Sequence, residues 1–98
     1  MLTSRQRAHL KRLAHPLKPI LQIGKEGASP EAIKAVEDAL NTRELLKFKV
    51  LEAAPQSARE TGEAVAAGIP NAEVVQVIGR TVILYRPHPE NPTIRLPD

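Results

Sequence analysis

The residues best suited to chemistry are two glycines that flank two charged residues, Gly24-Lys25-Glu26-Gly27. Glycine lets a backbone turn sharply and approach a ligand without a Cβ in the way. A strong helix start follows, because Ser29 can cap the helix and Pro30 suits its first position. A helix N-terminus presents unpaired N–H groups and a partial positive charge. The pattern therefore predicts a loop that holds a phosphate group, with Lys25 adding an ion contact.

The same loop also has a simpler interpretation as an ordinary tight turn between a strand and a helix, since many such turns carry two glycines. Other phosphate-binding motifs do not fit. The spacing is too short for a Walker loop, and no Lys-Ser/Thr pair follows. A dinucleotide fingerprint would need a G-x-G that this chain lacks.

Basic residues are concentrated at the N-terminal end of the chain. Residues 1–25 contain six basic residues and no acidic one, whereas the rest contains eight basic and eleven acidic residues. A basic end on a mildly acidic body favours a polyanionic partner. The alternative is a basic surface helix that only promotes solubility.

Hydrophobic periodicity, caps and breakers predict the element order α-β-α-β-α-β-β. Helices are expected over 3–14, over 29–40 and from 57 until Gly68. Strands are expected over 19–23, 45–51, 74–78 and 81–86. Alternating strands and helices indicate an α/β fold, here a single compact domain with a mixed four-stranded sheet layered with helices. The pair Gly79-Arg80 suits a type II′ hairpin.

The 98-residue chain is divided into a domain over 1–87 and a proline-rich extended tail over 88–98, with 93–96 as a candidate edge segment. In the first helix, Leu10, Leu13 and Leu17 are expected to face the core, and Arg5, His9 and Arg12 to face away from it. In the strand over 45–51, Phe48 points to the core. Lys47 and Lys49 lie opposite, most simply as a solvated face. Tyr85 is expected to pack beside the sheet rather than stack on a base.

Residues for catalysis or metal binding are not grouped in this sequence. There is no cysteine, which excludes disulfides and thiolate ligands. His9 and His15 do not have ligand spacing, and the adjacent Glu37 and Asp38 cannot converge on one substrate. We therefore expect a non-enzymatic protein with no metal, no cofactor and no small-molecule substrate.

No apolar run approaches the ~18 residues of a membrane helix, and the N-terminus has no apolar signal region. We expect a cytoplasmic protein without membrane contact. Nothing in the sequence indicates oligomerisation, so a monomer is expected.

Three separated motifs resemble a known family: LAHPLKP at 13–19, IGKEG at 23–27 and VIGRTVILYRP at 77–87. Together they look like the CRM domain and, more narrowly, the free-standing bacterial YhbY-like proteins. The resemblance spans nearly the whole chain. It implies a fold similar to the C-terminal domain of translation initiation factor three, a GXXG loop like that of KH domains, and RNA binding. Bacterial members of this family associate with precursors of the large ribosomal subunit.

Carried over by position, the resemblance implies that the loop and nearby basic side chains contact RNA. These residues are Gly24, Lys25, Glu26, Gly27, Arg5, Lys11, Arg12, Lys18, Arg80 and Arg86. Two departures stand out, since Glu26 places an acid inside the loop and Ala28-Ser29 replaces the leucine-threonine of many relatives.

The resulting hypothesis is an RNA-binding protein that contacts the backbone of ribosomal RNA through the loop and the basic N-terminal helix. Its expected partner is large-subunit ribosomal RNA or a pre-ribosomal particle, and its expected role is in assembly of the large subunit. The alternative is a protein–protein interaction module that docks through its sheet or its C-terminal tail.

Overall fold

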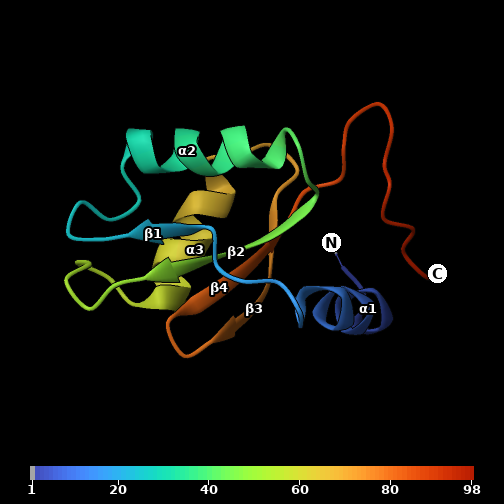
Figure 1. The fold of residues 1–98 in the computed structure, drawn as a ribbon, viewed down its shortest axis with the longest axis horizontal. Coiled ribbons are helices and arrows are strands. Elements are labelled where there is room, and N and C mark those ends of the chain that lie inside the picture. The colour runs from blue at the N-terminus through green and yellow to red at the C-terminus, as the bar shows by residue number, and fades with distance from the viewer. Residues whose placement is uncertain (1) are drawn as a thin grey trace.

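The computed structural model describes residues 2–98, and its elements follow the predicted order (Figure 1). The helices are α1 (Ser4–Ala14), α2 (Pro30–Leu40) and α3 (Ala58–Ala67). The strands are β1 (Leu21–Ile23), β2 (Leu45–Val50), β3 (Glu73–Ile78) and β4 (Thr81–Tyr85). The predicted α/β class is confirmed.

The four strands form one mixed sheet in the order β1-β2-β4-β3. β1 pairs with β2 in parallel, whereas β2 with β4 and β3 with β4 are antiparallel. The turn between β3 and β4 is tight, with Gly79 at a φ of 59°. Among residues 2–98, Asn71 is the one non-glycine residue with positive φ, so Arg80 has negative φ. A positive φ at the first central residue alone fits the predicted type II′ turn.

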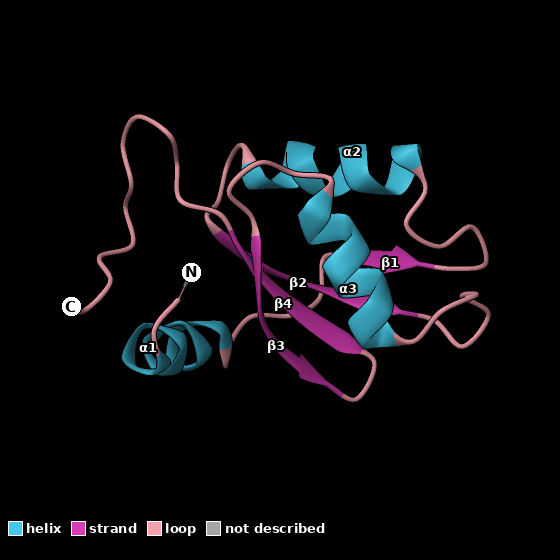
Figure 2. Cartoon of the chain, turned by 180° about the vertical axis from the view of Figure 1, so that it is seen from behind, coloured by secondary structure: helices cyan, strands magenta, loops and turns pink. Residues whose placement is uncertain are grey.

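Helices cover both faces of the sheet. α2 and α3 pack on one face, where Figure 2 shows α3 crossing the strands below α2. Their shared core contains Phe48, and the other buried residues include Val36, Leu40, Leu46, Val50, Val65, Val82 and Leu84. α1 packs on the other face, over Leu45, Val75, Ile83 and Tyr85. Alternate residues of β2 and β4 therefore feed two separate cores.

The predicted helix starts are confirmed by their hydrogen bonds. Thr3 and Gln6 form a capping box at α1, and Ser57 and Glu60 form one at α3. At α2, the Ser29 hydroxyl accepts a hydrogen bond from the Ala32 N–H. Such caps typically contribute about 1 kcal/mol each, so these local signals define where each helix begins.

The apolar stripe predicted for the first helix is partly wrong. Leu10 and Ala14 are buried, but Leu13 is 41% exposed and Leu17 is 38% exposed. α1 contacts the sheet along one narrow stripe, and the chain then leaves the helix at His15. Helical periodicity could not show how little of the helix surface the sheet would cover.

One basic residue of α1 has a structural role. β3 contains an irregularity between Val74 and Gln76, where the pairing with β4 shifts its register. The Arg7 guanidinium donates hydrogen bonds of 2.7 Å to the carbonyl oxygens of both Val74 and Val75. Arg7 therefore fastens α1 to β3 at the bulge, and its charge is directed into the fold.

Replacement of Arg7 by methionine is expected to lower the free energy of unfolding by about 1–2 kcal/mol. Methionine retains an apolar stem but leaves the two half-buried carbonyl groups without their donor. Urea denaturation measures the change. The control is Arg5→Met, since Arg5 is exposed on the same helix. Equal effects of the two substitutions would show that the bonds to the bulge contribute nothing.

The C-terminal segment 88–98 contains no helix or strand, so 93–96 is not an edge strand. It is held instead by Glu44, a carboxylate that is only 6% exposed. This carboxylate accepts hydrogen bonds from the N–H groups of His88, Thr93 and Ile94, and from the Thr93 hydroxyl. The segment therefore folds back onto the domain.

A second set of contacts extends this attachment to the end of the chain. The Gln6 side chain donates to the Pro97 carbonyl oxygen at 3.0 Å. Ile94 and Leu96 pack against the core beneath α1. The C-terminal segment consequently lies beside α1, as Figure 1 shows.

Candidate nucleic-acid interface

The glycine loop is a hydrogen-bonded turn at the end of β1. The Gly27 N–H donates to the Gly24 carbonyl oxygen at 2.9 Å, and Gly27 has a φ of 64°. This left-handed conformation favours glycine. Lys25 and Glu26 occupy the exposed tip of the turn. Both side chains are therefore available to a ligand.

The loop is supported by its neighbour between β2 and α3. A Cβ on Gly27 would lie 3.1 Å from Pro55 Cγ, so the two loops are in close contact. The Leu51 N–H also donates to the Ile23 carbonyl oxygen at 2.8 Å. Gly24 has more room, since a Cβ there would meet Leu51 at an ordinary 3.7 Å. Space and backbone conformation thus require glycine at the second position of the motif rather than at the first.

Several backbone donors at this loop remain open. Within residues 2–98, the N–H groups of Lys25, Glu26 and Ala28 have no protein acceptor. The N-terminus of α2 contributes fewer free N–H donors than its sequence implies. Pro30 has no N–H group, and the Ala32 N–H is already bonded to Ser29. Attraction of an anion would therefore depend mainly on Lys25 and the turn itself.

Arg80 belongs to the same end of the sheet as the loop. Its carbonyl oxygen accepts from the Val50 N–H at 2.7 Å, beside the point where β2 ends. Its guanidinium lies 3.8 Å from the Glu52 carboxylate, and both side chains are well exposed. An exposed ion pair of this kind is weak, so its loss to another anion would cost little stability.

The remaining predicted basic residues of the N-terminal region lie elsewhere. Arg5, Lys11 and Arg12 are exposed on α1, and Lys18 is exposed on the segment that leads from α1 to β1. Figure 1 shows α1 and the glycine loop toward opposite ends of the longest axis. The predicted site residues therefore form two groups, one around the loop and one around α1.

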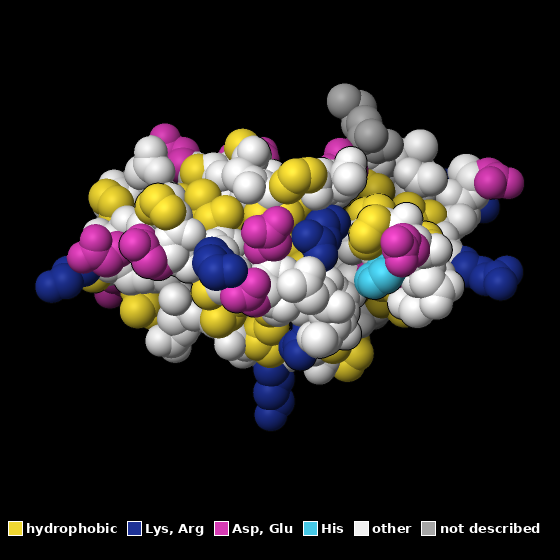
Figure 3. Space-filling model, turned by 90° about the horizontal axis from the view of Figure 1, so that it is seen from above, with side chains coloured by type: hydrophobic (Ala, Val, Ile, Leu, Met, Phe, Trp, Pro, Cys, Tyr) yellow, Lys and Arg dark blue, Asp and Glu magenta, His cyan; other side chains and the backbone are white. Residues whose placement is uncertain are grey.

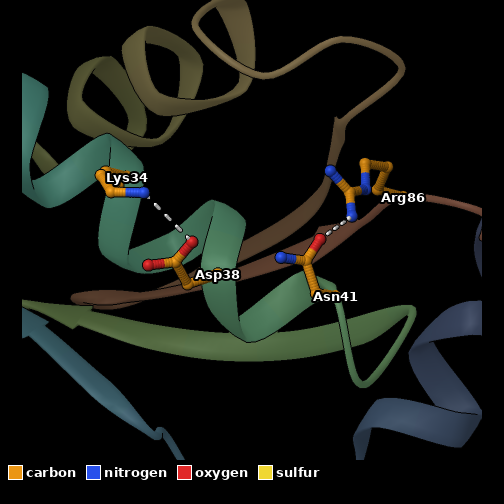
Figure 4. A network of polar contacts seen from close by, with 4 residues as sticks. All are labelled: Lys34, Asp38, Asn41 and Arg86. Carbon is orange, nitrogen blue, oxygen red and sulfur yellow. Dashed lines mark hydrogen bonds and ion pairs between the residues drawn. The ribbon is translucent and has the colours of Figure 1, made fainter.

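Arg86 is placed differently from both groups. It is half-buried and donates to the Asn41 side-chain oxygen at 3.1 Å (Figure 4). Its Nε is buried and has no hydrogen-bond partner in the described part of the chain, and Glu37 lines the same hollow. The guanidinium is thus directed toward the end of α2, away from both basic groups.

Sequence reasoning assigned no binding role to Lys47 and Lys49, which the structure places near basic residues of the N-terminal region. One hollow of about 270 Å³ is lined by Lys11, Arg12, His15, Lys47, Gln76, Ile78 and Ile83. A neighbouring hollow contains Lys18 and Lys49. Lys47 also donates to the Leu17 carbonyl oxygen at 2.9 Å, so it fastens the connecting segment. The alternation of the two lysines was visible in the sequence, but their neighbours were not.

The side of the molecule covered by α2, across the sheet from α1, has a different charge pattern. Over the face formed by α2, acidic and basic side chains are interspersed (Figure 3). Two of them, Lys34 and Asp38, form an exposed ion pair at 3.6 Å. A polyanion would find no continuous basic surface on this face.

Within residues 2–98, no group of three or more His, Asp or Glu side chains is arranged to hold a metal ion. The helices of this part of the chain are all too short or too polar to cross a membrane.

Comparison with known proteins identifies the family of this chain. The model of the CRS1 / YhbY (CRM) domain matches residues 2–86. The chain is 40% identical over 97 residues to the Bacillus subtilis probable RNA-binding protein YqeI, covering 99% of this chain and 100% of that one. It is 38% identical over 99 residues to a Haemophilus influenzae RNA-binding protein, covering 98% and 95%.

A solved structure agrees with these matches. The solution structure of the Staphylococcus aureus protein SAV1595 superposes with a TM-score of 0.82 at 41% identity. The superposition covers 99% of this chain and all of that one. The predicted resemblance is confirmed, and the chain belongs to the CRS1 / YhbY (CRM) domain family.

Proposed function

We propose that this protein binds RNA through backbone phosphates, with the glycine loop as one point of contact. The observation that carries the proposal is the turn at the end of β1. It presents Lys25 and open N–H groups of Lys25, Glu26 and Ala28 on a loop braced by Pro55. Relatives along the whole chain are named as RNA-binding proteins, which supports the same conclusion.

Recognition would depend on backbone and shape more than on base stacking. The chain has one phenylalanine, one tyrosine and no tryptophan. Phe48 and Tyr85 are both buried, so neither offers a face to an unstacked base. Without an aromatic platform, phosphate contacts supply most of the affinity and little sequence preference.

We further propose that the RNA is large-subunit ribosomal RNA, bound during assembly either as free RNA or within a pre-ribosomal particle. The resemblance of the three sequence motifs to YhbY-like proteins supports this choice. The protein would act in the cytoplasm as a monomer and without catalysis.

The first test is binding of a fluorescently labelled fragment of large-subunit ribosomal RNA over a salt series. A handful of phosphate contacts predicts a log–log slope of roughly −2 to −5, since each contact contributes about 0.7–0.9. Fluorescence anisotropy measures the affinity at each salt concentration. An absence of binding at low salt would end the RNA proposal.

Lys25→Asp is expected to weaken this binding by about tenfold, because it removes one phosphate contact and adds a repulsive charge. The matched control is Arg43→Asp, which makes the same change in charge at the far end of α2, where Arg43 is exposed. Circular dichroism checks that both variants are folded. Equal affinities of the two variants would show that the loop is not a contact.

A second candidate is docking of a protein on the open part of the sheet face beside α1. Among residues 2–98, four large apolar side chains are exposed in this region or on the segments that border it: Leu13, Leu17, Ile20 and Ile78. An apolar interface would bind almost independently of salt, whereas phosphate binding weakens steeply. The salt series therefore separates the two candidates.

A further inference from the structure

Three guanidinium groups and an imidazole line a cleft between α1 and the C-terminal segment. The cleft has a volume of about 360 Å³. Arg5, His9 and Arg12 contribute from α1, and Arg95 contributes from the C-terminal segment. None of the described residues that line it is acidic. This group was not evident from the sequence, because Arg95 is far along the chain from the other three residues.

The α1 side of the cleft follows from helix geometry. Positions 5, 9 and 12 are separated by four and three residues, so their side chains lie on one face of the helix. Leu10 and Ala14 are buried against the sheet. The three cleft residues occupy a different face, and Arg5 and Arg12 are exposed. The helix thus presents a row of basic groups toward the C-terminal segment.

The position of Arg95 is determined by anchors on both sides of it. On one side, the Ile94 N–H donates to Glu44 at 2.7 Å. On the other, Leu96 packs into the core beneath α1, and the Pro97 carbonyl oxygen accepts from Gln6. A backbone held at both neighbours loses little freedom when the Arg95 side chain engages a ligand.

The charges of the cleft are not neutralised by the protein. Within residues 2–98, the side chains of Arg5, Arg12 and Arg95 form no hydrogen bond or ion pair. Asp98 is the nearest acid along the chain, but it is exposed and does not line the cleft. Several unpaired guanidinium groups around one hollow attract an anion, and guanidinium groups bind phosphate through paired N–H donors.

We propose that this cleft is a second phosphate-binding site, which takes a phosphate of the RNA backbone and is completed by Arg95. The inference rests on the proposed RNA binding and adds a contact outside residues 2–86, the part that the family model matches. α1 and the glycine loop lie toward opposite ends of the molecule (Figure 1). One RNA of sufficient length can therefore engage both sites.

The test is Arg95→Gln in the full chain, with the labelled fragment of large-subunit ribosomal RNA. Loss of one phosphate contact is expected to weaken binding about fivefold at ~0.15 M salt and to reduce the log–log salt slope by roughly 0.7–0.9. Arg43→Gln is the matched control. It removes the same charge from an exposed position outside both sites and should leave the slope unchanged.

A second variant tests whether the anchored segment is needed. Glu44→Gln removes the carboxylate that holds His88, Thr93 and Ile94. It should weaken RNA binding as much as Arg95→Gln does, and the double variant should be no weaker than either. The control is Glu90→Gln, which makes the same change in charge at an exposed position. Circular dichroism at the assay temperature checks that each variant is folded.

The outcomes separate this inference from the proposed function. An unchanged affinity and slope in Arg95→Gln, together with weakened binding by Lys25→Asp, would overturn the cleft alone. An absence of RNA binding by the unmodified chain would overturn both. Titration with inorganic phosphate or with a poly-glutamate peptide tests whether the cleft binds anions other than RNA. Binding of either that depends on Arg95, without an Arg95 effect on RNA, would also overturn the RNA assignment.

Discussion

Glu44→Gln is expected to lower the free energy of unfolding by about 3 kcal/mol, because a buried carboxylate that accepts several hydrogen bonds is replaced by an amide. The carboxylate is 6% exposed and binds three N–H groups and one hydroxyl. The glutamine amide has only one oxygen, and its NH₂ group would face backbone donors. Urea denaturation measures the loss of stability.

Release of the C-terminal segment should accompany this loss. The N–H groups of His88, Thr93 and Ile94 would lose their acceptor, so their hydrogen exchange should become faster in the folded variant. Glu90→Gln is the control, since Glu90 is exposed in the same segment. A variant with native stability and slow exchange at Ile94 would show that the carboxylate does not anchor the segment.

The contribution of Glu44 to the free energy of unfolding should also depend on pH. Burial raises the pKa of Glu44, but the hydrogen bonds from His88, Ile94 and Thr93 outweigh it and hold the pKa below its ordinary value. A pKa that is lower in the folded chain stabilises the fold above the unfolded pKa of about 4.3. That stabilisation is lost as the pH falls through the folded pKa. The stability difference between the wild type and Glu44→Gln should therefore shrink below about pH 4.

Gly62→Leu is expected to lower the free energy of unfolding by about 3 kcal/mol, since overpacking of a tight core typically costs 1–3 kcal/mol and leucine adds four carbon atoms. Gly62 lies in α3, where it faces β4 at close range. A Cβ built there would be 2.9 Å from Val82 Cγ1 and 3.2 Å from Val82 Cγ2. Val82 is fully buried in the central strand β4, so it has little room to move.

Thermal denaturation measures the effect, and a double-mutant cycle identifies its cause. The double variant Gly62→Ala/Val82→Ala should be less destabilised than the sum of the two single variants. Alanine at position 82 is smaller than valine and makes room for the new methyl group at position 62. Ala67→Leu is the control on an exposed position of the same helix. Additive effects at Gly62 and Val82 would contradict the proposed steric cause.

The element order and the glycine loop could be predicted because their determinants are local. The capping boxes at Thr3 and Ser57 each use a partner three residues away. Gly27 adopts a backbone conformation that glycine favours, and the turn closes within four residues. Signals of this kind are readable from sequence because the interacting groups are neighbours in the chain.

The features that the sequence analysis got wrong or missed depend on packing between segments far apart in the chain. The exposure of Leu13 and Leu17 depends on how much of α1 the sheet covers. The role of Arg7 depends on a bulge in β3, and that of Glu44 depends on a segment more than forty residues away. None of these partners is adjacent in sequence, so periodicity and caps could not identify them.

The sequence by itself determined the α/β class, the helix starts, the turn at Gly27 and the basic character of the N-terminal region. Only the tertiary structure decided how the basic residues are grouped. It separated the glycine loop from α1, directed Arg86 toward Asn41, and brought Arg95 beside Arg12. Local hydrogen bonds and backbone preferences act over a few residues. The placement of charges across a surface depends on long-range packing, which joins segments far apart in the chain.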